Sequence, residues 1–100
     1  MDLSIIIVNY NTRLLTMQTV NSVIKTTRGI EYEVIVVDNS SKVSEYFEME
    51  DKRVKILSHV ENKGFGHACN IGVNIAIGRY ILFLNSVTIM EEGTLRGAVE

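Results

Sequence analysis

The sequence contains no proline and only one cysteine, Cys69. A single cysteine excludes an intrachain disulfide and a cysteine-rich zinc site, and it fits a reducing compartment such as the cytosol. The longest uninterrupted apolar runs are four or five residues, whereas a helix that spans a bilayer needs about 20. No signal peptide precedes the first of these runs. We therefore expect a cytoplasmic protein without a transmembrane segment.

The chain also lacks a strong excess of charge of either sign. Ten basic and twelve acidic side chains give a formal net charge of -2. Nucleic acids and anionic membrane surfaces are bound by basic patches, so neither is an expected partner. With 100 residues, 46% hydrophobic and 22% charged, the composition is that of one folded domain with a buried core.

Four short apolar runs are present, at residues 5–8, 34–37, 54–57 and 80–84. They do not alternate apolar with polar side chains, which is typical of strands covered on both faces in a parallel sheet. Helices are expected between them, from about Asn11 or Thr12 to near Gly29, weakly over 43–50, and over 65–77, with a last helix from near Glu91. The sequence predicts an α/β fold, a Rossmann-like parallel sheet sandwiched by helices.

Two of the predicted helices have recognisable inner faces. The first places apolar side chains on one side, at Leu14, Met17, Val20, Val23 and Ile24. In the helix over 65–77, small residues recur every four positions, at Ala68, Gly72 and Ala76. Such a stripe lets a helix lie close to a sheet, and Gly78 is the expected stop signal.

Short polar side chains follow three of the runs, as Asn9-Tyr10-Asn11, Asp38-Asn39-Ser40-Ser41 and Asn85-Ser86. The carboxyl ends of parallel strands form the rim of the ligand crevice, so these segments are expected to converge there. Two interpretations stay open. Asn11, Ser40 and Ser41 are also common turn formers and helix caps, and Tyr10 suits either the core or stacking on a base. Asp38 directly ends a buried strand and needs a partner, such as a ribose hydroxyl or a base N–H.

The segment over 62–70 precedes a predicted helix and contains Gly64 and Gly66. The glycines let backbone N–H groups approach a ligand, the helix N-terminus favours phosphate, and Lys63 adds positive charge. The segment is not a dinucleotide fingerprint, because Cys69 stands at the third glycine position. His59 and His67 have no second metal ligand at suitable spacing and are interpreted as ordinary surface or structural residues. Cys69 is interpreted as a small buried residue of the helix.

Four ordered motifs together resemble the family 2 glycosyltransferases: SIIIVNYN at 4–11, VVDNSS at 36–41, NKGFG at 62–66 with Asn70, and YILFLN at 80–85. The resemblance extends from residue 3 to about residue 95 and is strongest to the rhamnosyltransferase-like branch. It implies an incomplete GT-A fold of the nucleotide-diphospho-sugar transferase type. Residues 1–100 would then form the nucleotide-sugar-binding half, with the acceptor half absent.

The resemblance also implies an activity, the transfer of a hexose from a nucleotide-diphosphate sugar to an acceptor hydroxyl, in bacterial surface polysaccharide synthesis. The end of the first strand would hold the base, Asp38 would bond the base or the ribose, and the loop over 62–70 would close around the phosphates. The nucleotide-binding residues it indicates are Val8, Asn9, Tyr10, Asn11, Asp38, Asn39, Ser40, Lys63, Gly64, Gly66, Asn70 and Asn85.

One motif departs from the family pattern. The family has an acidic ligand for Mn or Mg after the fourth strand, whereas this sequence has Asn85-Ser86-Val87-Thr88, and valine offers no oxygen to a hard cation. Within residues 1–100 no catalytic base is nominated, so the chain alone is expected to be inactive. The alternative function is a nucleotide-binding or structural module that has lost catalysis. A piece of a larger sheet also exposes apolar surface, so we expect self-association.

Overall fold

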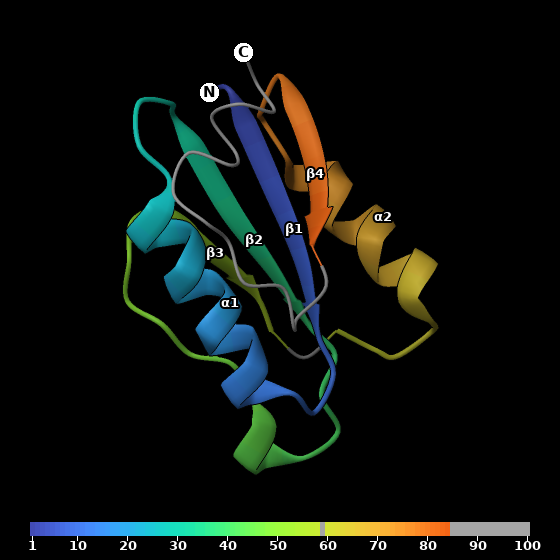
Figure 1. The fold of residues 1–100 in the computed structure, drawn as a ribbon. Coiled ribbons are helices and arrows are strands. Elements are labelled where there is room, and N and C mark those ends of the chain that lie inside the picture. Colours follow the sequence, from blue (N-terminus) through green and yellow to red (C-terminus); the bar gives the residue numbers. More distant parts are fainter. Residues whose placement is uncertain (59, 85–100) are drawn as a thin grey trace.

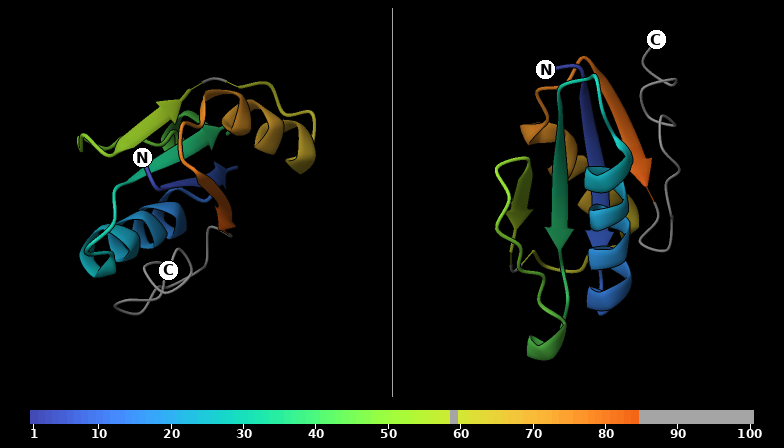
Figure 2. Two further views of the ribbon diagram at one scale, coloured as in Figure 1. Left: turned by 90° about the horizontal axis from the view of Figure 1, so that it is seen from above. Right: turned by 60° about the vertical axis from the view of Figure 1, so that its left-hand side comes forward.

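A four-stranded parallel sheet forms the centre of the computed structural model, which describes residues 1–58 and 60–84. The strands are β1 (Leu3–Asn9), β2 (Tyr32–Asp38), β3 (Val54–Leu57) and β4 (Tyr80–Leu84), in the order β3-β2-β1-β4. The helix α1 (Arg13–Thr26) covers one face and α2 (Phe65–Ile75) covers the other, with a 3-10 turn, η1 (Val43–Glu45), after β2 (Figures 1 and 2). The predicted α/β layering and the four strand positions are confirmed.

The two central strands are buried on both faces, as their apolar runs predict. On the α1 side the core contains Ile5 and Ile7 of β1, Val34 and Val36 of β2, and Val20 of α1. On the α2 side it is formed by Ile6, Ile35, Val37 and Ala68. Burial of apolar area, at roughly 25 cal/mol per Å², is the main favourable term in this arrangement.

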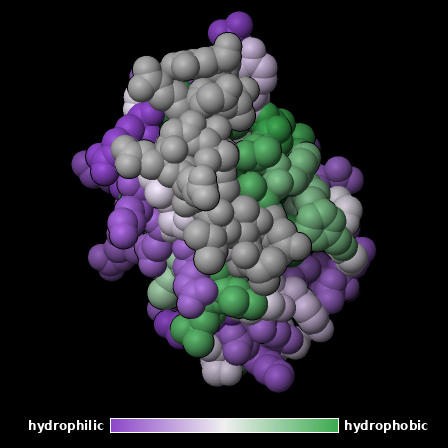
Figure 3. All heavy atoms as spheres, viewed as in Figure 1, coloured by the Kyte–Doolittle hydropathy of each residue, from purple (hydrophilic) through white to green (hydrophobic). Residues whose placement is uncertain are grey.

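β4 does not have the double cover that its apolar run predicts. Tyr80, Ile81 and Phe83 are 46%, 42% and 48% exposed. The reason is strand order: among the described strands β4 pairs only with β1, so it lies at an edge of the sheet. The hydrophobic surface on the right-hand side of Figure 3 lies over β4 and α2.

The first helix buries most of the predicted face, because Val20 and Val23 are buried and Met17 and Ile24 pack against the core. Leu14 is the exception at 67% exposure, and Thr16 and Thr19 are buried in addition. Thr16 lies inward because its hydroxyl donates to the amide oxygen of Asn9, at 2.8 Å. A polar contact at the end of β1 therefore helps to set the rotation of α1.

The small-residue face of α2 lies against the sheet, as expected. A Cβ added at Gly72 would stand 2.8 Å from Cγ2 of Ile6 and 3.3 Å from Cγ2 of Val37. Ala68, one turn earlier, is fully buried. The helix ends at Ile75, before the predicted residue 77, since the next residue, Ala76, has extended backbone.

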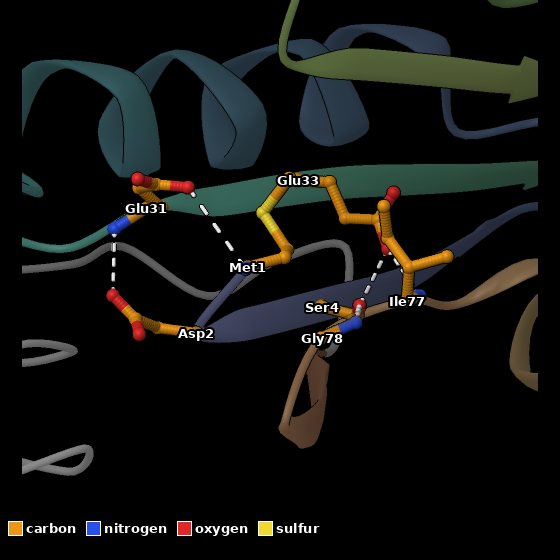
Figure 4. A network of polar contacts seen from close by, with 7 residues as sticks. All are labelled: Met1, Asp2, Ser4, Glu31, Glu33, Ile77 and Gly78. Carbon is orange, nitrogen blue, oxygen red and sulfur yellow. Dashed lines mark hydrogen bonds and ion pairs between the residues drawn. The ribbon is translucent and has the colours of Figure 1, made fainter.

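A buried carboxylate that the sequence analysis did not single out fixes the segment between α2 and β4. Oε2 of Glu33 accepts hydrogen bonds from the Ser4 hydroxyl (2.6 Å) and the Ile77 N–H (2.8 Å), and Oε1 lies 2.7 Å from the Lys55 ammonium. The Gly78 N–H donates to the Ser4 hydroxyl at 2.7 Å. Figure 4 shows Ser4, Glu33, Ile77 and Gly78 meeting at one point, near the amino ends of β1 and β2.

These contacts determine both the charge state of Glu33 and the residue at position 78. Burial raises the pKa of Glu33, but hydrogen bonds from Ile77, Lys55 and Ser4 outweigh it, and the pKa lies below its ordinary value. A Cβ at Gly78 would stand 2.4 Å from the Ser4 nitrogen, so only glycine fits. The helix does not continue into this segment, because the N–H groups of Ile77 and Gly78 donate to the side chains of Glu33 and Ser4 and not to helix carbonyls.

The remaining element predictions are settled in part. The weak helix expected over 43–50 is the three-residue turn η1. The helix expected from near Glu91 lies outside the described residues. Within residues 1–58 and 60–84, no helix has both the length and the apolar character needed to cross a bilayer.

Candidate functional site at the carboxyl edge of the sheet

The polar segments after β1 and β2 converge, as the sequence predicts. Asn9 and Asp38 are register partners at the ends of these strands. The Asn9 amide donates to Oδ1 of Asp38 at 3.1 Å, and both side chains are buried, with 0% and 2% exposure. A polar pair therefore stands at the carboxyl edge of an otherwise apolar sheet.

Asp38 obtains hydrogen-bond donors from the chain itself. Besides Asn9, the Ser40 N–H donates to Oδ1 at 3.1 Å and the Phe47 N–H donates to Oδ2 at 2.7 Å. A buried carboxylate is costly unless it is hydrogen-bonded, and these three donors offset that cost. A carboxylate has about four lone-pair positions, and donors from the described residues occupy three of them.

Asn9 joins three parts of the chain. Its Nδ2 donates to the Ser40 hydroxyl (3.1 Å) and to the backbone carbonyl of Glu45 (2.9 Å). Its Oδ1 accepts hydrogen bonds from Thr12 (3.2 Å) and Thr16 (2.8 Å). This side chain is fully engaged with the protein, so it orders the rim of the site.

Asn11 fastens the first turn to the loop after β2. Its backbone has φ 53°, a left-handed conformation that asparagine tolerates better than most residues. Its N–H donates to the Ser40 hydroxyl (2.9 Å), and its Oδ1 accepts the N–H groups of Ser41 (3.1 Å) and Lys42 (3.2 Å). The turn-forming role considered for Asn11, Ser40 and Ser41 matches these contacts.

The N-terminus of α1 is capped from a distant part of the chain. Thr12 is the N-cap residue, but its side chain makes no capping hydrogen bond. Instead, Oε2 of Glu45 accepts the Arg13 N–H at 3.0 Å. The sequence does not identify Glu45 or Phe47 as residues of this site. Glu45 contacts Arg13 and Phe47 contacts Asp38 only because the loop after β2 folds back.

Asn39 contributes a buried acceptor that has no partner among residues 1–58 and 60–84. It is 5% exposed, its N–H donates to the Asn9 carbonyl (3.1 Å), and its Nδ2 lies 3.4 Å from Oδ1 of Asn62. Its own Oδ1 accepts no hydrogen bond from the described residues. An unsatisfied buried acceptor costs about 1–3 kcal/mol, which a hydroxyl or N–H donor from a ligand would recover.

The loop before α2 reaches this edge through Asn62, whose Oδ1 also accepts the Gly64 N–H at 3.2 Å. Gly64 has φ +98°, which favours glycine, and it begins α2 without any side-chain cap or acidic residue in the first turn. Free N–H groups at such a terminus favour an anion. Lys63 is exposed and forms a long 3.6 Å ion pair with Glu61.

The other predicted site residues differ in their placement. Val8 is partly buried and packs against the α2-side core, whereas the Tyr10 ring is 46% exposed. Gly66 and Asn70 are exposed in α2, as is His67. Cys69 is buried, and desolvation raises the pKa of its thiol, in keeping with a structural role. Asn85, Ser86, Val87, Thr88 and His59 lie outside the described residues.

The described part of the chain does not fit a metal site. It contains no cluster of three or more His, Cys, Asp or Glu side chains that could hold a metal ion. Members of the family that the sequence resembles generally use a divalent metal ion. Because the sequence has Val87 at the expected acidic position, no chemical step is assigned to a metal here.

Known proteins match both the sequence and this geometry. The chain is 34% identical over 99 residues to glycosyltransferase GlyG of Streptococcus pneumoniae, covering 93% of this chain and 32% of that protein. It is 35% identical over 86 residues to the Escherichia coli UDP-Glc:alpha-D-GlcNAc-diphosphoundecaprenol beta-1,3-glucosyltransferase WfgD, covering 83% and 34%. The chain thus spans about a third of the length of these relatives.

A solved structure shows the same fold. S. aureus TarS 1–349 in complex with UDP superposes with a TM-score of 0.78 at 27% identity, over 98% of this chain and 31% of that one. This confirms the GT-A type of α/β fold, of which the chain is a part. The model of glycosyl transferase family 2 matches residues 4–100. The chain is therefore a member of glycosyl transferase family 2.

Proposed function

We propose that residues 1–100 form the donor-nucleotide-binding part of a glycosyltransferase, which transfers a hexose from a nucleotide-diphosphate sugar to an acceptor hydroxyl. The observation that supports this most is the polar carboxyl edge, in a chain whose fold matches a UDP complex of TarS. A second TarS structure contains UDP-GlcNAc, at 28% identity and a TM-score of 0.74.

The proposed nucleotide site uses side-chain groups that are exposed or that have no partner in the described part of the chain. The exposed Tyr10 ring offers a stacking face for a base. Oδ1 of Asn39 accepts a ribose hydroxyl or a base N–H, with Asp38 beside it as a second acceptor. Val8, Asn9, Asn11 and Ser40 shape this rim, and Asn85 is proposed from the resemblance alone.

The phosphates are assigned to the loop before α2. There the uncapped first turn of α2 supplies N–H donors, and Lys63 supplies positive charge. Gly64, Gly66 and Asn70 belong to the same segment. Charge develops on the departing nucleoside diphosphate as the acceptor oxygen attacks the anomeric carbon, and these donors stabilise it. The general base that takes the acceptor proton is not assigned to any residue of this chain.

The proposed pathway is the synthesis of a bacterial surface polysaccharide. Relatives include the minor teichoic acid biosynthesis protein GgaB of Bacillus subtilis, at 30% identity, and the succinoglycan biosynthesis protein ExoO of Rhizobium meliloti, at 28%. A cytoplasmic location is proposed with it, because the chain has a single, buried cysteine.

Calorimetric titration with UDP, GDP and dTDP tests the nucleotide site. We expect saturable binding of one of the three, with uridine, guanosine or thymidine alone binding more weakly because the phosphate contacts are lost. A chain with a folded, dispersed NMR spectrum that binds none of the three diphosphates would contradict the proposal.

The alternative, a nucleotide-binding module without catalysis, is favoured by one specific observation, Val87 at the acidic ligand position. If it is right, Val87→Asp introduces manganese-dependent binding of the diphosphate that the parent chain lacks. Tight manganese binding by the parent chain would exclude this alternative. Transfer activity, measured with a radiolabelled donor sugar, separates the two functions directly.

A further inference from the structure

The two α-helices that begin at the carboxyl edge differ in what caps them. At α1, the Glu45 carboxylate accepts the Arg13 N–H at 3.0 Å, although Glu45 is 32 residues away. At α2, Gly64 at the N-cap makes no side-chain hydrogen bond, and no acidic residue lies in the first turn. A helix N-terminus carries a partial positive charge of about half a unit and attracts an anion. Glu45 therefore serves as an internal anion for α1.

The position of this carboxylate is built into the loop after β2. The backbone carbonyl of Glu45 accepts hydrogen bonds from the amide of Asn9 (2.9 Å) and the hydroxyl of Ser40 (3.3 Å). Its N–H donates to the Lys42 carbonyl at 2.9 Å. Backbone contacts on both sides of the residue thus direct its side chain to the first turn of α1, beside η1 at the lower end of the molecule (Figure 1).

Space for an external anion is present beside the same helix turn. A hollow of about 190 Å³ is lined by Asn11, Thr12, Arg13, Leu14, Leu15 and Glu45. A phosphate group would fit the hollow by size. Arg13 lines the same hollow, but Glu45 already accepts its N–H, so a phosphate at this turn would have to compete with the carboxylate for that donor.

We propose that Glu45 is a specificity-determining residue of the carboxyl edge, which keeps the phosphates of a nucleotide ligand away from the first turn of α1. The inference rests on the proposed nucleotide-binding function and adds a residue to it. The rim formed by β1 and α1 is then left to the uncharged parts of the ligand, the base and the ribose. A ligand with its phosphate at this turn would have to displace Glu45.

Backbone amide NMR spectra recorded during titrations with inorganic phosphate and with UDP test this inference. In the parent chain, neither ligand should shift the amide signals of Arg13, Leu14 and Leu15. In Glu45→Ala, inorganic phosphate should shift all three signals along a saturable binding curve. Glu45→Gln, which keeps an oxygen acceptor but not the charge, should respond less strongly.

Glu48→Ala is the matched control, because Glu48 is an exposed acid in the same loop. It should behave as the parent chain does. If Glu45→Ala fails to fold, Glu45→Gln decides the question. A folded variant whose three amides ignore phosphate overturns the inference, and so do UDP-induced shifts at these amides in the parent chain. UDP that shifts no signal at all contradicts the proposed function instead, and leaves the phosphate comparison valid.

Discussion

The Ser4 hydroxyl lies 2.6 Å from the Glu33 carboxylate, between register partners on the neighbouring strands β1 and β2. This buried contact gives a direct prediction for stability. Glu33→Ala leaves Ser4 and the Ile77 N–H without an acceptor and removes the partner of Lys55. We expect a loss of about 2–4 kcal/mol in the free energy of unfolding, measured with urea. Glu48→Ala, at an exposed acid, should change it by less than about 0.5 kcal/mol.

The same contact predicts how stability depends on pH. The folded-state pKa of Glu33 is lowered from its ordinary value of 4.5. Its stabilising contribution is therefore complete above pH 4.5 and is lost as the pH falls through the folded-state pKa. Urea unfolding of Glu33→Gln between pH 7 and pH 3 should show a flatter decline than the parent chain. Asp51, whose pKa is lowered to about 2 by Arg53, is present in both proteins and cancels. Parallel curves would contradict the prediction.

Gly72→Ala tests the close approach of α2 to the sheet. The new methyl group would stand 2.8 Å from Cγ2 of the buried Ile6, so overpacking should cost about 1–3 kcal/mol despite the better helix propensity of alanine. Gly66→Ala in the same helix meets no atom within 4 Å. It should be neutral or stabilising by up to about 1 kcal/mol in thermal unfolding. Equal melting temperatures for the two variants would refute the packing argument.

Asn9→Asp places a second carboxylate beside Asp38. The two buried charges repel, and the donor to Oδ1 of Asp38 is lost. The free energy of unfolding at pH 7 should fall by at least about 3 kcal/mol. One of the pair acquires a raised pKa, so part of the loss should be recovered as the pH falls below that value. The variant's stability, measured with urea, should therefore rise from pH 7 to pH 5 while the parent's does not.

Asn39→Ala separates binding from stability. The amide oxygen has no partner among the described residues, so its removal should cost little in unfolding. If a nucleotide donor bonds this oxygen, the calorimetric dissociation constant for the preferred diphosphate should rise about threefold to tenfold. Asn74→Ala, at an exposed position of α2, is the control and should leave both quantities unchanged. Unaltered affinity in Asn39→Ala would remove this residue from the site.

Local patterns in the sequence were enough to predict the strands and the meeting of Asn9 with Asp38. Apolar runs identify strands, and parallel strands bring their carboxyl ends together. The exposure of β4 depends on strand order, which no local pattern contains. The role of Glu45 depends on a contact across 32 residues. Glu33 directly precedes the apolar run 34–37, and only the three-dimensional neighbours of its carboxylate explain a buried charge there.

The long-range cap on α1 also has a dynamic consequence. The bonds from Asn9 to the Glu45 carbonyl and from Arg13 to the Glu45 carboxylate join positions 36 and 32 residues apart. When the loop after β2 lifts away, the first turn of α1 loses its cap in the same event. Loop opening and helix fraying are therefore one cooperative motion, and amide exchange at Arg13 reports how often this rim of the crevice opens.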